Sequence, residues 1–201
     1  MVEMETRTFA CELRAETDGE ENGTNKIIGY GSVFNSRSEN LGGFREIIMP
    51  GAFDDVLDDD VRGLFNHDPN FVLGRNKANT LTLSTDETGL RYEIDAPKTQ
   101  TIRDLVIEPM MRGDINQSSF AFRIARHGDE WDEDDDGVIV RTIHKVSRLF
   151  DIGPVTYAAY SDASSATRSM KLWQEARDSG LLKQAISQRQ ARERLLTIAG
   201  A

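Results

Sequence analysis

Short segments in which apolar and polar residues alternate recur through most of this sequence, and they constrain its fold more than any other feature. Successive side chains of a β-strand point to opposite faces of a sheet, so such segments predict strands with one buried face. In the clearest pair, two alternating runs at 80–84 and 90–94 flank the turn residues 86–89, which predicts a β-hairpin. The other segments expected to form strands are 7–13, 26–34, 61–66, 118–126, 138–150 and 155–157.

Two segments between the strands have helical spacing instead. Residues 50–57 follow Pro50, a residue suited to a helix start, and predict a short helix with Phe53, Val56 and Leu57 on one face. Residues 99–112 predict a second helix that Gly113 caps and that Pro109 kinks or shortens. Its apolar residues at helical spacing are Ile102, Leu105, Val106 and Met110.

Seven or eight mostly antiparallel strands with interleaved helices predict a mainly β fold, a β-barrel or a sandwich, followed by a C-terminal helical tail. Charge supports a division into residues 1–167 and 168–201. Residues 168–201, the tail, hold seven basic and three acidic residues and so carry a net charge of +4. Because the whole chain carries −10, residues 1–167 carry −14. We therefore expect one domain and a basic tail that is removed or binds a scaffold.

Composition narrows the functional classes. The single cysteine, Cys11, excludes an intramolecular disulfide and favours a reducing compartment. No apolar run reaches the roughly 18 residues of a membrane span, and residues 1–5 lack the features of a signal peptide. The acidic charge argues against nonspecific binding to nucleic acid, which depends on Lys and Arg. We expect an intracellular protein that binds neither membrane nor nucleic acid.

Two patterns suggest metal sites but fit them poorly. Residues 132–137 resemble the start of a calcium-binding loop, yet the twelfth position, which should be Glu, is Ile143. A solvated acidic loop at 129–137 is the better interpretation. A metal-dependent hydrolase using His67, Asp68 and His127 has no compact ligand spacing. We expect no metal and no cofactor.

The candidates for nucleophilic catalysis are a serine, a histidine and an acid at strand ends. His67 lies where a loop can present it, whereas His127 adjoins the acidic loop and His144 lies within a predicted strand. In segment 118–126, alternation places Ser118 on the core face and Ser119 on the other face, beside a small residue that leaves room for a substrate. Asp151 stands among apolar residues, an unusual place for a carboxylate without a partner. A serine needs a histidine to accept its proton, and the histidine needs a third group to orient it.

The order of several motifs resembles the prohead (capsid-maturation) protease family of tailed bacteriophages, which is related to the herpesvirus assemblin serine proteases. The resemblance extends over roughly residues 7–162. Its motifs are the segments 29–35, 42–46, 50–53, 64–68, 72–75, 112–115, 119–122 and 150–160.

This resemblance implies an assemblin-like β-barrel and a role for each candidate. His67 would be the general base, Ser119 the nucleophile and Asp151, where relatives often carry Glu, the third member. Assemblins use a second histidine in the third role, so His144 is the alternative. Gly153 is a candidate supplier of an oxyanion-binding N–H. The sequence departs from the family at Ala121, Pro109 and Ala158, none of which is a catalytic group.

The resemblance further implies a serine endopeptidase that cleaves the scaffold portion of the major capsid protein, and itself, inside an assembling prohead in the bacterial host's cytoplasm. Homo-oligomerisation is compatible with this role. The alternative is a catalytically inactive capsid-assembly protein of the same fold.

Overall fold

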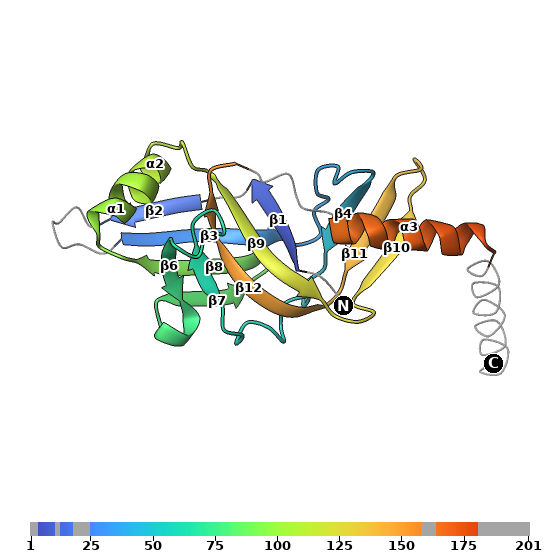
Figure 1. Cartoon of the computed structure of the whole chain (residues 1–201), viewed down its shortest axis with the longest axis horizontal. Coiled ribbons are helices and arrows are strands. Elements are labelled where there is room, and N and C mark those ends of the chain that lie inside the picture. The colour runs from blue at the N-terminus through green and yellow to red at the C-terminus, as the bar shows by residue number, and fades with distance from the viewer. Residues whose placement is uncertain (1–3, 11–12, 18–24, 158–163, 181–201) are drawn as a thin grey trace. The chain divides into compact units, whose positions relative to one another are not determined.

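The computed structural model describes residues 4–10, 13–17, 25–157 and 164–180 (Figure 1). The chain forms two units, Met1–Ser165 and Ala166–Ala201. Cys11, Ala158 and the tail beyond residue 180 lie outside the described residues. Helix α3 (Ser164–Asp178) agrees with the helical start expected for the tail. No helix in the described part of the chain is long and apolar enough to span a membrane.

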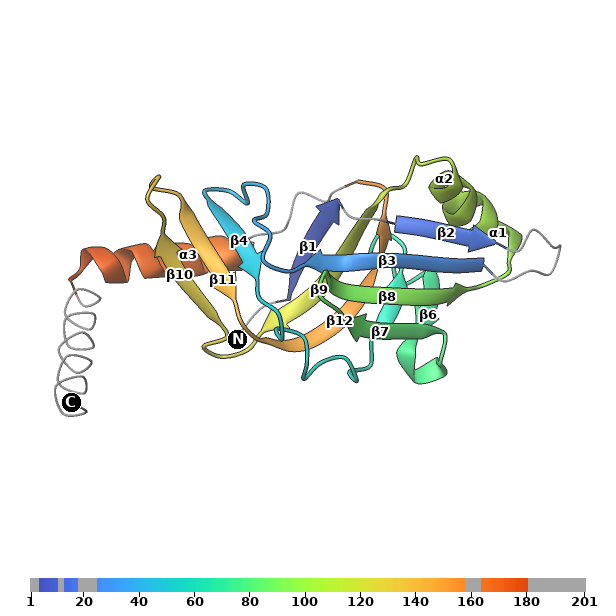
Figure 2. The ribbon, with the colours of Figure 1, turned by 180° about the vertical axis from the view of Figure 1, so that it is seen from behind.

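The described strands of the first unit form three sheets, which Figures 1 and 2 show from opposite sides. The five-stranded sheet has the order β1 (Glu5–Ala10), β9 (Gln117–Ile124), β12 (Val146–Val155), β5 (Arg62–Leu64) and β6 (Val72–Arg75). The four-stranded sheet has the order β2 (Leu13–Thr17), β3 (Asn25–Val33), β8 (Gly89–Ala96) and β7 (Leu81–Thr85). The three-stranded sheet has the order β10 (Asp129–Glu133), β11 (Ile139–Ile143) and β4 (Phe44–Ile48).

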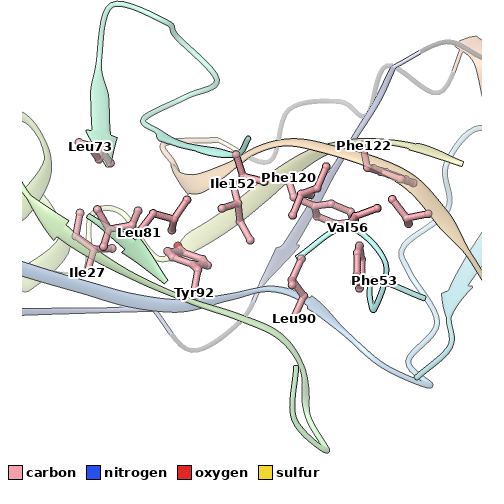
Figure 3. Packing of buried hydrophobic residues seen from close by; sticks show 14 of the residues in the cluster. Ile27, Phe53, Val56, Leu73, Leu81, Leu90, Tyr92, Phe120, Phe122 and Ile152 are labelled. Carbon is pink, nitrogen blue, oxygen red and sulfur yellow. The ribbon is translucent and has the colours of Figure 1, made fainter. Parts of the chain in front are cut away.

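The core lies between the five-stranded and the four-stranded sheets. Phe120 and Ile152 point from the first sheet toward Leu90 and Tyr92 on the second, and all four are fully buried (Figure 3). The approach is so close that a Cβ on Gly31 would lie 2.4 Å from Cδ1 of Ile152. The mainly β class with interleaved helices is therefore confirmed. Within the described residues, the strand pairings form open sheets that pack as a sandwich, so the expected closed barrel is not formed.

Several strands differ from the predicted ones. The hairpin at 80–94 is confirmed as β7 and β8, but segment 7–13 contributes to β1 and β2, which lie in different sheets. Segment 138–150 likewise divides into β11 and β12, because the N–H groups of His144 and Lys145 both donate to the carbonyl of Gly128 instead of continuing a ladder. Strands β4, β6 and β10 were not predicted from the sequence.

The helix expected at 50–57 is wrong, although its apolar residues were correctly identified. Consecutive turns form there, with N–H groups donating three residues back at Ala52, Asp54 and Val56. Gly51 has φ +85°, outside the helical region, so no regular helix can include it. Ala52, Phe53 and Val56 are nevertheless buried in the core.

The second helix is present, with an irregularity that Pro109 explains. It runs through α1 (Gln100–Ile102), the π-helical turn η2 (Arg103–Ile107) and α2 (Glu108–Met111). Proline lacks the N–H that a regular helix needs, and the wider π turn immediately precedes it. The turn shifts the buried face, so that Ile107 is buried while Leu105 is 47% exposed, against the expectation. Gly113, with φ +81°, follows the helix as expected.

Four charged side chains form a buried ion cluster that joins β1 to β4 and β11: Glu5, Arg7, Glu46 and Arg141. Arg7 donates to both carboxylate oxygens of Glu46, at 2.8 and 3.0 Å, and to Glu5 at 2.5 Å. Arg141 donates to Glu5 at 2.8 Å and to Glu46 at 3.2 Å. Burial alone would lower the pKa of both guanidinium groups, but the neighbouring carboxylates outweigh it and raise both values.

Replacing Arg141 with methionine should strongly destabilise the fold. The variant leaves two buried carboxylates facing one guanidinium, and breaking a buried ion pair in this way costs about 3–5 kcal/mol of unfolding free energy. Urea denaturation measures the loss. The matched control is Arg75→Met, which removes the solvent-exposed pair with Asp60 and should cost far less. Equal losses in the two variants would contradict a special role for the buried ion cluster.

Candidate active site

The serine pair on β9 is divided between the two faces of the five-stranded sheet. Ser118 Oγ lies 2.7 Å from the Tyr92 hydroxyl on the core side, which confirms that Ser118 belongs to the core face. Ser119 points the other way, as alternation requires. Both serines are fully buried, and Ala121 beside Ser119 is 1% exposed, so the space expected for a substrate is filled in this structure.

His67 reaches Ser119 from the loop between β5 and β6. Its Nε2 lies 2.6 Å from Ser119 Oγ, and its Nδ1 lies 2.5 Å from Oδ1 of Asp151. The backbone at Asn66 and His67 adopts the left-handed conformation, with φ of +54° and +57°. Two consecutive non-glycine residues rarely adopt it, and this turn directs the imidazole toward β9. At 21%, the side chain of His67 is more exposed than that of Asp151, at 13%.

Strand order explains why residues distant in sequence meet here. β12 pairs with β9 on one side and with β5 on the other. In these ladders Asp151 lies opposite Ala121 of β9 and opposite Arg62 of β5, whose hairpin carries His67. Strands β9 and β12 therefore supply the nucleophile and the acid of the predicted set, and the loop that follows the adjacent β5 supplies the base. The structure brings all three predicted residues together.

The two distances at His67 favour one arrangement of the protons on the imidazole and on the Ser119 hydroxyl. An ionised carboxylate only accepts hydrogen bonds, so the Asp151 contact places the proton of a neutral imidazole on Nδ1 and leaves Nε2 free to accept the Ser119 hydroxyl. A second acceptor competes for that hydroxyl: the Arg7 carbonyl of β1, 2.9 Å from Ser119 Oγ. Only when the hydroxyl donates to His67 Nε2 rather than to the Arg7 carbonyl can the histidine accept its proton, which is the requirement for nucleophilic catalysis.

Gly153 lies directly opposite Ser119 in the β9–β12 ladder. A Cβ at this position would lie 2.1 Å from the Leu64 carbonyl oxygen, so only glycine allows β5 to approach β12 this closely. Gly153 thus has a packing reason to be glycine. Its role as an oxyanion donor stays a prediction.

The other histidines lie apart from this arrangement. His144 stands in the connection between β11 and β12, and its Nε2 lies 3.7 Å from the Glu130 carboxylate. His127 is exposed, as expected, in the turn after β9. Asp68 caps its own turn by accepting from the backbone and side-chain amides of Asn70. The residues proposed for a metal-dependent hydrolase thus make separate contacts.

The acidic loop is a hairpin rather than a calcium site. Residues 129–133 of the expected loop form strand β10, and Asp134 accepts from the N–H groups of Asp136 and Val138 and from Arg37. Among the described residues, no group of three or more His, Cys, Asp or Glu side chains could hold a metal ion.

Two residues beside the site had no role in the sequence analysis. The side chain of Asn66 bonds to Thr156, just beyond the end of β12. Both residues occur in the motifs quoted for the resemblance. Asparagine is enriched in the left-handed conformation, so its position immediately before His67 was a usable signal for a special turn.

A family model described as "caudovirus prohead serine protease" matches residues 10–176. The matched range includes His67, Ser119 and Asp151, and it begins at the last residue of β1. Comparisons with curated proteins and with solved structures gave no match.

Proposed function

This chain belongs to the caudovirus prohead serine protease family, and we propose from that premise that Ser119, His67 and Asp151 form its catalytic triad. The observation that carries the proposal is the chain of contacts from Asp151 Oδ1 to His67 Nδ1 at 2.5 Å and from His67 Nε2 to Ser119 Oγ at 2.6 Å. Both lengths lie within hydrogen-bond reach, as a nucleophile, its base and the orienting acid require.

The proposed chemistry is acyl transfer. Ser119 Oγ attacks the carbonyl carbon of a peptide bond while its proton passes to His67 Nε2. Asp151 keeps Nδ1 protonated, so Nε2 is the free acceptor, and its charge stabilises the imidazolium that forms. The imidazolium then gives its proton to the departing amine. Water, deprotonated by the same histidine, releases the acid product and restores Ser119.

We further propose that the substrate is the scaffold portion of the major capsid protein, together with the protein's own tail at 168–201. The description of the family as a prohead serine protease supports this proposal. The net charge of +4 on the tail favours binding to an acidic partner, either a scaffold or residues 1–167 of the same chain, which carry −14. In this role the protein acts inside the assembling prohead, in the cytoplasm of the bacterial host.

Incubating the purified full-length chain with the major capsid protein tests this function. Intact-mass spectrometry should show a capsid protein that has lost its scaffold portion, together with a fragment from which the chain's own tail has been removed. The same reaction with a chelating agent should proceed at the same rate, since the proposed mechanism uses only side chains.

Three results would contradict the proposal. An unchanged capsid protein would favour the inactive capsid-assembly protein. A reaction that stops with the chelator would favour a metal-dependent hydrolase. Cleavage of the capsid protein without loss of the tail would retain the protease and reject self-processing.

A further inference from the structure

The turn that carries His67 is hydrogen-bonded to the end of β12, the strand that carries Asp151. Nδ2 of Asn66 donates to Thr156 Oγ1 at 3.1 Å, and Oδ1 of Asn66 accepts from the Thr156 N–H at 2.8 Å. The Asn66 N–H also donates to the Pro154 carbonyl at 3.1 Å. Three hydrogen bonds thus join the residue before the histidine to the end of β12, within five residues of Asp151.

The backbone at Asn66 and His67 requires stabilising contacts. Asn66 and His67 both have positive φ, a conformation that L-residues adopt at an energetic cost and keep only where neighbouring contacts impose it. The bonds to Thr156 and Pro154 are contacts of this kind. A rotation of the turn would swing the imidazole away from both Ser119 and Asp151, because the side chain of His67 leaves the chain at this point.

Core packing does not account for the pair. Asn66 and Thr156 are both exposed, so their hydrogen bonds contribute little to the stability of the fold. They lie where the β5–β6 loop meets the end of β12. We infer that Asn66 and Thr156 are positioning residues, which hold His67 at its distances from Ser119 and Asp151. This inference rests on the proposed function.

Asn66→Gly is the sharpest test, because glycine adopts φ near +54° without strain and removes only the side-chain bonds. We expect kcat to fall roughly 10- to 100-fold, with KM and the melting temperature nearly unchanged, since small displacements of a catalytic group cost rate rather than binding. The substrate is a fluorogenic peptide that spans the cleavage site mapped on the capsid protein.

Matched variants separate positioning from general effects. Asn79→Gly replaces another exposed asparagine with φ +57°, at the turn before β7, and should retain the wild-type kcat. Thr156→Val removes the hydroxyl that accepts from Asn66 and should lower kcat, whereas Thr156→Ser keeps the hydroxyl and should restore it.

The outcomes distinguish this inference from the function on which it rests. If the wild type cleaves the peptide and Asn66→Gly has the same kcat, the positioning role is wrong and the protease stands. A loss of kcat that is equal in Asn79→Gly, or that is accompanied by an equal loss of folded protein, also overturns the positioning role. An inactive wild type overturns both.

Discussion

Ser119→Ala should abolish cleavage while leaving the fold intact. The hydroxyl that lies 2.6 Å from His67 Nε2 is the proposed nucleophile, and the variant leaves no hydroxyl at that position. Removing the serine of a triad lowers kcat by about six orders of magnitude, to the residual rate that binding and oxyanion stabilisation support. Mass spectrometry of the capsid protein after prolonged incubation measures the loss.

The neighbouring serine provides a matched control. Ser118 is equally buried, one residue away on the same strand, but its hydroxyl bonds to Tyr92 on the core face. Ser118→Ala should cost about 1 kcal/mol of unfolding free energy through the lost hydrogen bond and should leave kcat close to the wild-type value. If Ser119→Ala cleaves at the wild-type rate, or if Ser118→Ala loses as much kcat as Ser119→Ala, Ser119 is not the nucleophile.

Asp151→Asn should lower kcat by about four orders of magnitude with little change in the fold. The amide of asparagine can donate to Nδ1 of His67, which then carries no proton. The proton moves to Nε2, and the imidazole loses the lone pair that would accept the Ser119 proton. Steady-state cleavage of the mapped peptide, with circular dichroism as the check on folding, measures the effect.

The control for this variant is His144, the alternative third member. His144→Gln removes an exposed side chain whose contact is Glu130, so cleavage should continue at the wild-type rate. The opposite pattern, in which His144→Gln is inactive and Asp151→Asn is active, would reassign the third role to the histidine and reject Asp151.

Much of the fold could be predicted because local periodicity reports which face of a strand is buried. The hairpin β7–β8 and the two faces of β9 follow from alternation alone. The failures arise where tertiary structure overrides local pattern. The segment 50–57 has the expected buried side chains but forms turns instead of a helix, and Gly51 has a positive φ. The long segment 138–150 divides into two strands where the N–H groups of His144 and Lys145 donate to the Gly128 carbonyl.

The three candidate catalytic residues could be predicted from the sequence, but the contacts that hold them in position could not. His67, Ser119 and Asp151 could be identified by residue type and from the ordered motifs, although Asp151, expected at a strand end, lies within β12. The Asn66–Thr156 contact spans 90 residues of sequence, and no local spacing reports it. The buried ion cluster was missed for a related reason. Charged residues are usually exposed, so Glu5 and Arg7 at the start of the chain counted only toward net charge.

The buried ion cluster also has a consequence for the order in which the chain folds. Its hydrogen bonds join residues separated by 39, 95 and 136 positions, and contacts of such long range form late because the intervening loops must first be closed. We therefore expect strand β1 to dock near the end of folding, and with it the Arg7 carbonyl that contacts Ser119. On this expectation a partly folded chain would lack the finished surroundings of Ser119, and proteolytic competence would be delayed until the first unit has folded.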